Sequence, residues 1–485
     1  MKLTTYKYTI PAFILFILGG LTACNTDSLN VIPQTSISEE MAYSTPAKIL
    51  AQVNNLYGQV QNASFYGGRF VVFNEQRGDE FGQNDGNAAT GSAVWNQSVA
   101  ASTDFVNNVW TAQYSAINAS NILISKLNGT TIISDSLAKT YIGEAKFIRA
   151  LSYLSLVQTY AKPYNLDKNV PGVPLRLTAI TSAGNNNLAR SSIAEVYTQI
   201  LKDLNEAEIS LPNAHATAFL NVSRAKKSSA IALKTRVYLI QGDYANVSKE
   251  SAKLVSASSP FQYVSGSVTH KLETNFITIF GGSYTGSEAI FSIPFANSTT
   301  ETPPAQSSLA YTYVGQPILF LNPAGIVENT VFSNPADARS TLIITNSARQ
   351  KLLKKFAIST APFRDYVPVI RYAEILLNYA EATANMNNLI TATTLLKAVR
   401  NRSNPSFIFD ENDLKTKESL LSLIMTERRI ELLGEGFRLQ DLQRKVQALP
   451  AKTGTIGSAP SVLVTAGNYI WPIPSSEIST NSLIQ

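Results

Sequence analysis

The sequence predicts a mainly α-helical protein whose helices are interrupted by two long irregular segments. Apolar residues recur with helical spacing through most of 104–256 and 366–445, and also in the shorter stretch 40–60. That period is lost in 62–102 and 258–365, where Gly, Asn, Ser, Thr and Pro accompany scattered aromatic residues. We therefore expect a helical scaffold that supports an irregular, loop-rich portion.

The first 24 residues follow the pattern of a bacterial lipoprotein signal. A basic start and an apolar run over 10–18, too short to span a bilayer, precede Leu21-Thr22-Ala23. The next residue, Cys24, is the only cysteine of the chain. We expect residues 1–23 to be removed and Cys24 to carry a covalent lipid. The alternatives are an ordinary secretory signal followed by a chance cysteine, or an unstructured tail.

Asn25, the apolar runs and the net charge of the sequence indicate the compartment, cofactors and partners to expect. Asn25 stands where an aspartate would favour the inner membrane, so we expect anchoring in outer-membrane lipid. No second run approaches about 18 apolar residues, so no other membrane-spanning segment is expected. The formal net charge of +6 is mild and gives no reason to expect a nucleic-acid partner. No cofactor is expected beyond the lipid on Cys24.

Helix boundaries follow from capping residues and from breaks in the apolar period. Thr45-Pro46 has the form of an N-cap followed by proline in the first turn, which opens a helix to residue 57. Ser192 and Glu195 form a capping box ahead of a helix to residue 211. The other helices are predicted over 104–127, 137–160, 225–241, 245–256, 368–385, 391–402 and 415–433.

The irregular segments are predicted as ordered loops with a few short strands. Residues 62–102 form the longest expected loop region, and ordered loops of that length are usually functional. Residues 289–294 are predicted as a short strand. Two prolines make 471–474 extended.

Consecutive helices are expected to pack as divergent tetratricopeptide-like pairs, because their apolar stripes match but no fixed repeat length is visible. One expected stripe and its partner on the next helix consist of Tyr372, Ile375, Leu376, Tyr379 and Ala380, and of Leu395, Leu396 and Val399.

Carboxylates on the last helices are predicted to form a structural network of ion pairs. Glu374 and Glu381 lie seven residues apart and project from one side of a helix. Glu427 and Glu431 are like charges four residues apart, which is unfavourable unless cations neutralise them. The alternative is a carboxylate pair that acts as general acid and base. The cations available for neutralisation are Arg371, Arg402, Arg428, Arg429 and Arg438.

Several motifs lie in a set order along nearly all of the mature chain. They are GEAKFIRA at 143–150, VPL at 173–175, RSS with VY at 190–197, RYAEILLNYAEA at 371–382, VRNR at 399–402, ERRIEL with EGFRLQDL at 427–442, and PIP with EI at 472–478. This ordered set, together with the lipoprotein signal, resembles the SusD/RagB family of surface nutrient-binding lipoproteins from Bacteroidetes-type bacteria.

The resemblance implies a SusD-like fold in a single domain over 24–485, with four tetratricopeptide-like units supporting an irregular ligand-binding portion. It implies a lipid-anchored protein on the outer face of the outer membrane, partnered by a SusC-like TonB-dependent transporter. Such a protein captures oligosaccharide or polysaccharide, or peptide in RagB-like members, and delivers it without catalysing a reaction. A surface hydrolase and a scaffold that binds only protein are the other functions considered.

Sugar rings bind to aromatic faces edged by polar side chains, and such residues concentrate in two places. Trp95 has core packing as its alternative role, and the tyrosines are evenly divided between ligand contact and packing. The first candidate cluster consists of Arg77, Asp79, Glu80, Asn84, Asp85, Trp95 and Asn96, and the second of Tyr284, Tyr311 and Tyr313.

Metal binding and histidine-based catalysis have little support in the sequence. Residues 83–87 lack the spaced ligands and terminal glutamate of a calcium loop, so a surface turn is expected there. His215 and His270 have no partner pattern that would indicate zinc or a catalytic triad. No metal is therefore expected, and no recognisable acid/base signature supports a hydrolase.

Overall fold

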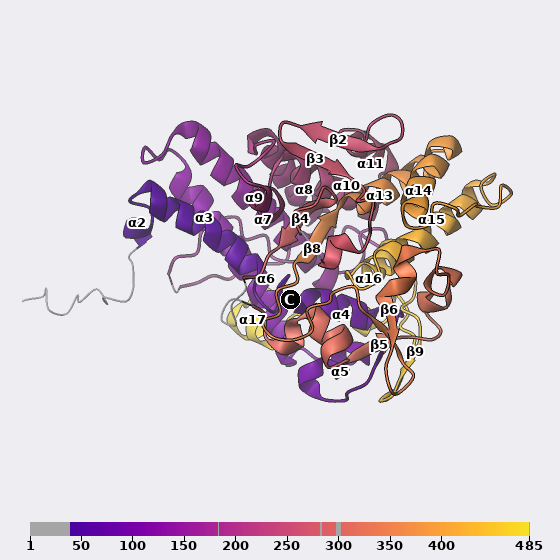
Figure 1. The fold of residues 1–485 in the computed structure, drawn as a ribbon. Helices are drawn as coiled ribbons and strands as arrows, with labels where there is room; N and C mark the ends of the chain where they lie inside the picture. Colours follow the sequence, from indigo (N-terminus) through magenta and orange to yellow (C-terminus); the bar gives the residue numbers. More distant parts are fainter. Residues whose placement is uncertain (1–38, 183, 282–283, 297–301, 485) are drawn as a thin grey trace, which may run out of the picture. The chain divides into compact units, whose positions relative to one another are not determined.

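The computed structural model describes residues 39–182, 184–281, 284–296 and 302–484 (Figure 1). The chain divides into two compact units, residues 1–50 and 51–485. The described part of the first unit contains α2 (Glu39–Ala42) and the start of α3 (Pro46–Val60). The predicted signal peptide and Cys24 lie outside the described residues.

A row of helices forms the scaffold of the second unit. Helices α6, α7, α8, α10, α11, α13 and α14 contact one another in that order along the row, and α15 packs on both α13 and α14. Their bounds, with those of the shorter helices, are α4 (Arg69–Arg77), α5 (Ser92–Trp95), α6 (Asp104–Leu127), α7 (Asp135–Tyr160), α8 (Ile193–Ser210), α9 (Ala218–Ser223), α10 (Lys227–Gln241), α11 (Tyr244–Ser251), α12 (Thr278–Gly281), α13 (Tyr372–Asn385), α14 (Leu389–Ser403), α15 (Lys417–Glu431), α16 (Arg438–Arg444) and α17 (Ser475–Thr480).

The strands of the described residues are short and pair into two-stranded antiparallel sheets. In the β4–β8 sheet, Ala289 lies opposite Arg371 and Ile293 opposite Val367. The strands are β1 (Phe81–Gln83), β2 (Gln262–Ser265), β3 (Val268–Lys271), β4 (Ala289–Ile293), β5 (Leu319–Leu321), β6 (Ile343–Thr345), β7 (Lys351–Leu353), β8 (Val367–Arg371), β9 (Lys452–Gly454) and β10 (Gly457–Ala459), paired as β1–β5, β2–β3, β4–β8, β6–β7 and β9–β10.

The mainly α fold class is confirmed, and several helix boundaries agree with the sequence. Helix α6 has the predicted limits. The capping box opens α8, because the Ser192 hydroxyl accepts from Glu195 N (3.2 Å) while Glu195 accepts from Ser192 N (2.7 Å). Helix α10 ends at Gln241 and is followed by Gly242, whose φ of 71° suits glycine. The short strand expected at 289–294 is present as β4.

Several segments differ from the expected secondary structure, and two of them show why. Residues 367–371 form β8 rather than the start of a helix, because they pair with β4 far away in sequence. Residues 69–77 form α4 inside the expected loop region, and every residue of α4 is buried. Neither outcome is visible in local periodicity, since both depend on a distant partner.

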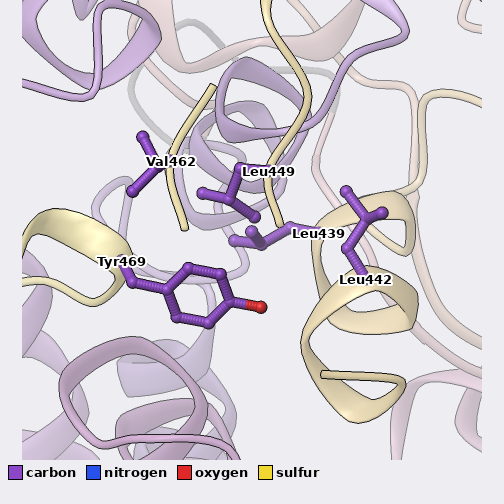
Figure 2. Packing of buried hydrophobic residues seen from close by; sticks show 5 residues of the cluster. All are labelled: Leu439, Leu442, Leu449, Val462 and Tyr469. Atoms are coloured by element: carbon purple, nitrogen blue, oxygen red, sulfur yellow. The ribbon is translucent and has the colours of Figure 1, made fainter. Parts of the chain in front are cut away.

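The C-terminal segment packs back onto α16. Leu439 and Leu442 of α16 form a buried cluster with Leu449, Val462 and Tyr469 (Figure 2). The Tyr469 hydroxyl donates to the carbonyl oxygen of Gln447 (2.7 Å). This cluster holds the extended chain that follows α16 against the scaffold.

A network of buried ion pairs joins the helical scaffold to the irregular portion. Glu427 Oε1 lies 2.5 Å from Arg339 Nη1, and its Oε2 lies 2.5 Å from Arg400 Nε. Glu431 Oε1 lies 2.5 Å from Arg402 Nη2 and 3.1 Å from Arg371 Nη1. All of these side chains are buried or nearly so.

Arg371 and Arg402 extend the network to Glu288, which directly precedes β4. Arg371 Nη1 lies 2.5 Å from Glu288 Oε1, and Arg402 Nη1 lies 2.8 Å from Glu288 Oε2. With the remaining partners the network contains equal numbers of acidic and basic side chains. The acids are Glu288, Asp337, Glu427, Glu431 and Glu435, and the bases are Arg339, Lys355, Arg371, Arg400 and Arg402.

The predicted structural role of the carboxylates is confirmed, because Glu374 pairs with Arg236 (2.7 Å) and Glu381 with Arg444 (2.7 Å), while Glu427 and Glu431 join the network above. Some of the expected cations have other partners. Arg428 pairs with Asp441 (2.8 Å), Arg429 with Glu80 (2.7 Å) and Arg438 with Asp79 (2.6 Å). Arg339 and Arg400 take their place beside Glu427.

The charges lower the pKa of the buried Glu431 carboxyl. Burial by itself would raise this pKa, but attraction from Arg402, Arg371 and Arg339 outweighs it. Glu431 is therefore ionised in the folded protein and acts as a structural anion.

We predict that Glu427→Ala lowers the free energy of unfolding by about 3–5 kcal/mol, because it leaves buried arginines with uncompensated charge. Chemical denaturation followed by circular dichroism measures the loss. The matched control is Glu411→Ala, since Glu411 pairs with Lys397 at 3.6 Å on the exposed surface. That variant is expected to change stability by less than about 1 kcal/mol. Equal effects of the two variants would contradict the structural role of the network.

Candidate functional site

Trp95, the central residue of the first expected cluster, is packed in the core. It ends α5 and has no exposed surface. Its Nε1 donates to the carbonyl oxygen of Phe81 (2.9 Å), and Lys452 Nζ lies 5.3 Å from its ring centroid. The expectation of an exposed aromatic platform at Trp95 is therefore wrong, and the packing alternative is correct.

The charged residues of that cluster connect segments of the fold. Arg77 is buried, and its Nη2 donates to the carbonyl oxygen of Tyr469 (2.7 Å). The carboxylates of Asp79 and Glu80 pair with Arg438 of α16 and Arg429 of α15, as described above. These contacts leave Arg77 enclosed by protein and assign the two acids to structural ion pairs.

The amide residues of the cluster also have structural partners. Asn84 Nδ2 donates to the carbonyl oxygen of Pro317 (2.9 Å), and its Oδ1 accepts from Gln350 Nε2 (2.6 Å). Asp85 is exposed, but its Oδ1 accepts from Asn87 N (2.8 Å) and so stabilises the expected turn. Asn96 is half-buried at the C-terminal end of α5. The first cluster therefore does not converge on one exposed surface.

The three tyrosines of the second cluster divide into one packed residue and two that reach the surface. Tyr313 has no exposed surface; its ring stacks on Phe81 with centroids 5.2 Å apart, and its hydroxyl donates to Gly434 O (3.1 Å). A ligand platform at Tyr313 is therefore wrong. Tyr284 and Tyr311 are half-buried.

Tyr284 forms a stacked pair with Tyr366. Their ring centroids are 4.4 Å apart and the ring planes differ by 13°. The Tyr284 hydroxyl donates to Asp365 Oδ1 (2.6 Å), which fixes the ring from the other end. Tyr366 is also half-buried, so the pair is a rigid aromatic surface that remains partly accessible to solvent.

Tyr311 is connected to this pair through one short segment. It opens a π-helical turn, Tyr311–Gly315, a geometry found often at functional sites. Its ring meets Phe363 edge to face, with centroids 5.6 Å apart. Phe363 precedes Tyr366 by three residues. We call Tyr284, Tyr311, Phe363, Asp365 and Tyr366 the tyrosine site.

Asp365 orders the tyrosine site. Its Oδ1 accepts from the Tyr284 hydroxyl and its Oδ2 from Ile358 N (2.7 Å). Burial raises the pKa of Asp365, and these hydrogen bonds oppose the rise. Burial, followed by the neighbouring Asp365, raises the pKa of Tyr284. Tyr284 is therefore a protonated donor at neutral pH, so its bond to Asp365 persists.

A cavity of about 230 Å³ adjoins Tyr284. Glu273 Oε1 accepts from Ser287 N (2.5 Å) and Oγ (2.7 Å), and Glu288 Oε2 accepts from Glu273 N (2.9 Å). These bonds hold two carboxylates in the wall, one of which belongs to the ion-pair network. The cavity is lined by Glu273, Thr278, Ile279, Tyr284, Gly286, Glu288 and Ala289.

The arrangement of aromatic surface, hydroxyl groups and hydrogen-bond acceptors suits a polar ligand with apolar faces. Among the described residues, no group of three or more His, Cys, Asp or Glu side chains is placed to hold a metal ion. In the same part of the chain, no helix is both long and apolar enough to cross a bilayer.

Sequence reasoning missed Phe363, Asp365 and Tyr366. A signal was present, because this aromatic and charged stretch lies between Pro362 and Pro368 in an irregular segment. Its position next to Tyr284 depends on the pairing of β4 with β8, which brings residues about 80 positions apart side by side.

Two family models match most of the chain. One, described as "Starch-binding associating with outer membrane", matches residues 29–239, and the model of the SusD family matches residues 353–485.

Relatives of known sequence or structure share nearly the full length. A SusD superfamily protein from Bacteroides fragilis is 31% identical, with a TM-score of 0.81 over 91% of this chain and 99% of that chain. SusD-like protein P38 of Formosa agariphila is 24% identical over 96% of this chain and 95% of its own length. A laminarin-binding SusD-like protein has the same fold, with a TM-score of 0.72 and 21% identity over 91% of this chain and 99% of that chain.

We predict that Trp95→Ala lowers the free energy of unfolding by about 3–5 kcal/mol, because it opens a cavity in the core. Trp95→Phe retains most of the volume and loses the hydrogen bond to Phe81, so a loss of about 1 kcal/mol is expected. Thermal and denaturant unfolding measure both losses. A Trp95→Ala protein with unchanged stability but weakened ligand binding would reverse this assignment.

Proposed function

The chain belongs to the SusD/RagB family, and on that premise we propose that it captures glycan at the tyrosine site. The observation that carries the proposal is the stacked Tyr284–Tyr366 pair, which remains half-buried and is braced by Asp365 beside a cavity. Sugar rings have apolar C–H faces that pack on aromatic rings, while their hydroxyls bond to groups at the ring edge. The tyrosine site supplies both kinds of contact.

Rigidity of the site supports a binding role. Tyr284 is held by a stacked ring on one side and by the Asp365 carboxyl, which accepts from its hydroxyl, so little side-chain freedom is lost when a ligand binds. The laminarin-binding protein with the same fold makes a neutral glucan a reasonable first ligand to test.

We further propose that the protein works on the outer membrane, held by lipid on Cys24, and passes its ligand to a SusC-like TonB-dependent transporter without catalysing a reaction. Two or more acyl chains anchor a protein stably, whereas one does not. The residues between Cys24 and Pro33, among them Asn25, Thr26, Asp27 and Ser28, separate the proposed lipid attachment from the rest of the chain.

The test is retention of polysaccharide by variants of the tyrosine site. In native affinity gels containing laminarin or soluble starch, and in calorimetry with the retained polysaccharide, Tyr366→Ala is expected to weaken binding about tenfold, or about 1.4 kcal/mol. Tyr284→Phe is expected to weaken it less, because the ring remains and only the bond to Asp365 is lost. Melting temperatures should change little, since both rings are half-buried.

The matched control is Tyr164→Ala. Tyr164 is also half-buried and meets Tyr197 at 5.0 Å, but it follows α7 in the scaffold. Its loss should leave retention unchanged. Full retention by Tyr366→Ala, or cleavage of the bound polysaccharide, would overturn the proposal. Saturable binding of peptides in place of glycans would show that the ligand is a peptide.

We predict that Cys24→Ala abolishes incorporation of labelled palmitate and releases the protein from the outer-membrane fraction, because the lipid has no other attachment site. Metabolic labelling and membrane fractionation measure the two effects. Continued labelling of the variant would contradict the lipoprotein assignment.

A further inference from the structure

A second pocket, of about 210 Å³, lies where α3, α9 and the end of β4 meet. None of its lining residues belongs to the tyrosine site or to the cavity beside it. The lining consists of Asn54, Tyr57, Gly58, Gln61, Phe219, Leu220, Ser223, Arg224, Ile293 and Pro294.

Gly58 leaves one wall of this pocket open without a structural reason for glycine. It lies inside α3, where glycine is less favourable than alanine because it has more backbone freedom to lose. A Cβ atom at this position would meet no heavy atom within 4 Å. Packing therefore does not require glycine at position 58, whereas an open pocket does.

Phe219 supplies an aromatic surface in the lining of this pocket. It lies on α9 and is 46% exposed, which is unusual for so large an apolar side chain. The helix is firmly placed, because Thr217 caps its start by accepting from Leu220 N (3.2 Å). The ring is therefore presented to solvent at a defined position.

Polar side chains in the lining of the pocket are held in fixed orientations. Arg224 Nε and Nη2 donate to the buried Glu144 carboxylate at 2.8 and 2.5 Å, and Nη1 is the remaining donor nitrogen. The Tyr57 hydroxyl donates to the same carboxylate (2.5 Å). Gln61 Nε2 donates to Pro294 O (2.5 Å), and its Oε1 is the remaining acceptor.

We propose that this pocket is a second sugar-binding site, which takes one sugar ring of a glycan against Phe219. The ring's hydroxyls bond to Arg224 Nη1 and Gln61 Oε1, and Gly58 provides the space. An aromatic face combined with a planar donor and an amide is the chemistry that recognises a sugar. The class of occupant rests on the proposed glycan binding, but the pocket is a separate site.

The two sites lie near opposite ends of one strand. Ala289 lines the first cavity and Ile293 lines the second, and four residues of a strand span about 13 Å. One glycan of several residues that engages both sites gains affinity, because the second contact is made within the same complex.

The experiment uses the full mature chain with Tyr366→Ala, which weakens the tyrosine site, and assigns the remaining binding to the second site by its response to substitutions there. Saturation-transfer NMR is carried out with the methyl glycosides of glucose, galactose, mannose, xylose and N-acetylglucosamine. Binding of at least one glycoside is expected. Adding Gly58→Leu, which fills the pocket, or Phe219→Ala, which removes the platform, should weaken that binding about tenfold.

The matched control is Asn55→Leu, which adds the same side chain to an exposed position of α3 outside the pocket and should leave glycoside binding unchanged. The melting temperature of Gly58→Leu should be equal or higher, because leucine is the better helix former. A loss of binding is then not a loss of fold.

Two outcomes would overturn the second site. In one, no glycoside binds the Tyr366→Ala protein; in the other, binding is unaffected by both Gly58→Leu and Phe219→Ala. Neither outcome affects the tyrosine site, whose proposed role is tested separately by polysaccharide retention in the Tyr366→Ala single variant. Conversely, normal retention by that single variant together with glycoside binding blocked by Gly58→Leu would leave the second site as the sugar site.

Discussion

The buried ion pairs around Glu288, Glu427 and Glu431 are the constraint on which the rest of the second unit depends. A carboxylate without exposed surface needs a cation and hydrogen bonds at the same place, and each arginine needs its carboxylates in turn. Arg371 is the last residue of β8, and it meets this requirement only when β4 and α15 adjoin that strand. Its partner Glu288 directly precedes β4, Glu431 ends α15, and Glu435 follows α15. The network therefore specifies which elements are neighbours more than it adds net stability.

The ion-pair network also positions the candidate sites, because they adjoin β4 and β8. Glu288 belongs to the network and lines the cavity, and Tyr284 precedes it by four residues. Arg371 ends β8, five residues after Tyr366. The stacked tyrosines thus emerge from two chain segments that are clamped a few residues away. At the other end of β4, Ile293 and Pro294 form part of the second pocket. The β4–β8 pair therefore positions both the tyrosine site and the second pocket.

Aromatic composition by itself does not identify which aromatic residues are exposed to a ligand. Trp95 and Tyr284 both stand in sequence surroundings that contain several Gly and Ser residues. Trp95 is enclosed because α5 packs on α4, a helix that is buried along its whole length. Tyr284 remains partly exposed because its neighbour is another half-buried ring in a loop. Exposure is a property of the packed neighbours, which the local sequence does not describe.

The sequence by itself determined the helical scaffold, the break between regular and irregular segments, the family, and the structural role of the carboxylates on α13 and α15. These follow from the helical spacing of apolar residues and from capping residues such as Ser192 and Glu195. They also follow from like charges one helical turn apart, which require cations nearby. Only the tertiary structure decided that 367–371 is a strand, that Arg339 and Arg400 neutralise Glu427, and that Tyr366 completes the tyrosine site. Each of these depends on contacts between residues far apart in the chain, where burial and pairing outweigh local preference.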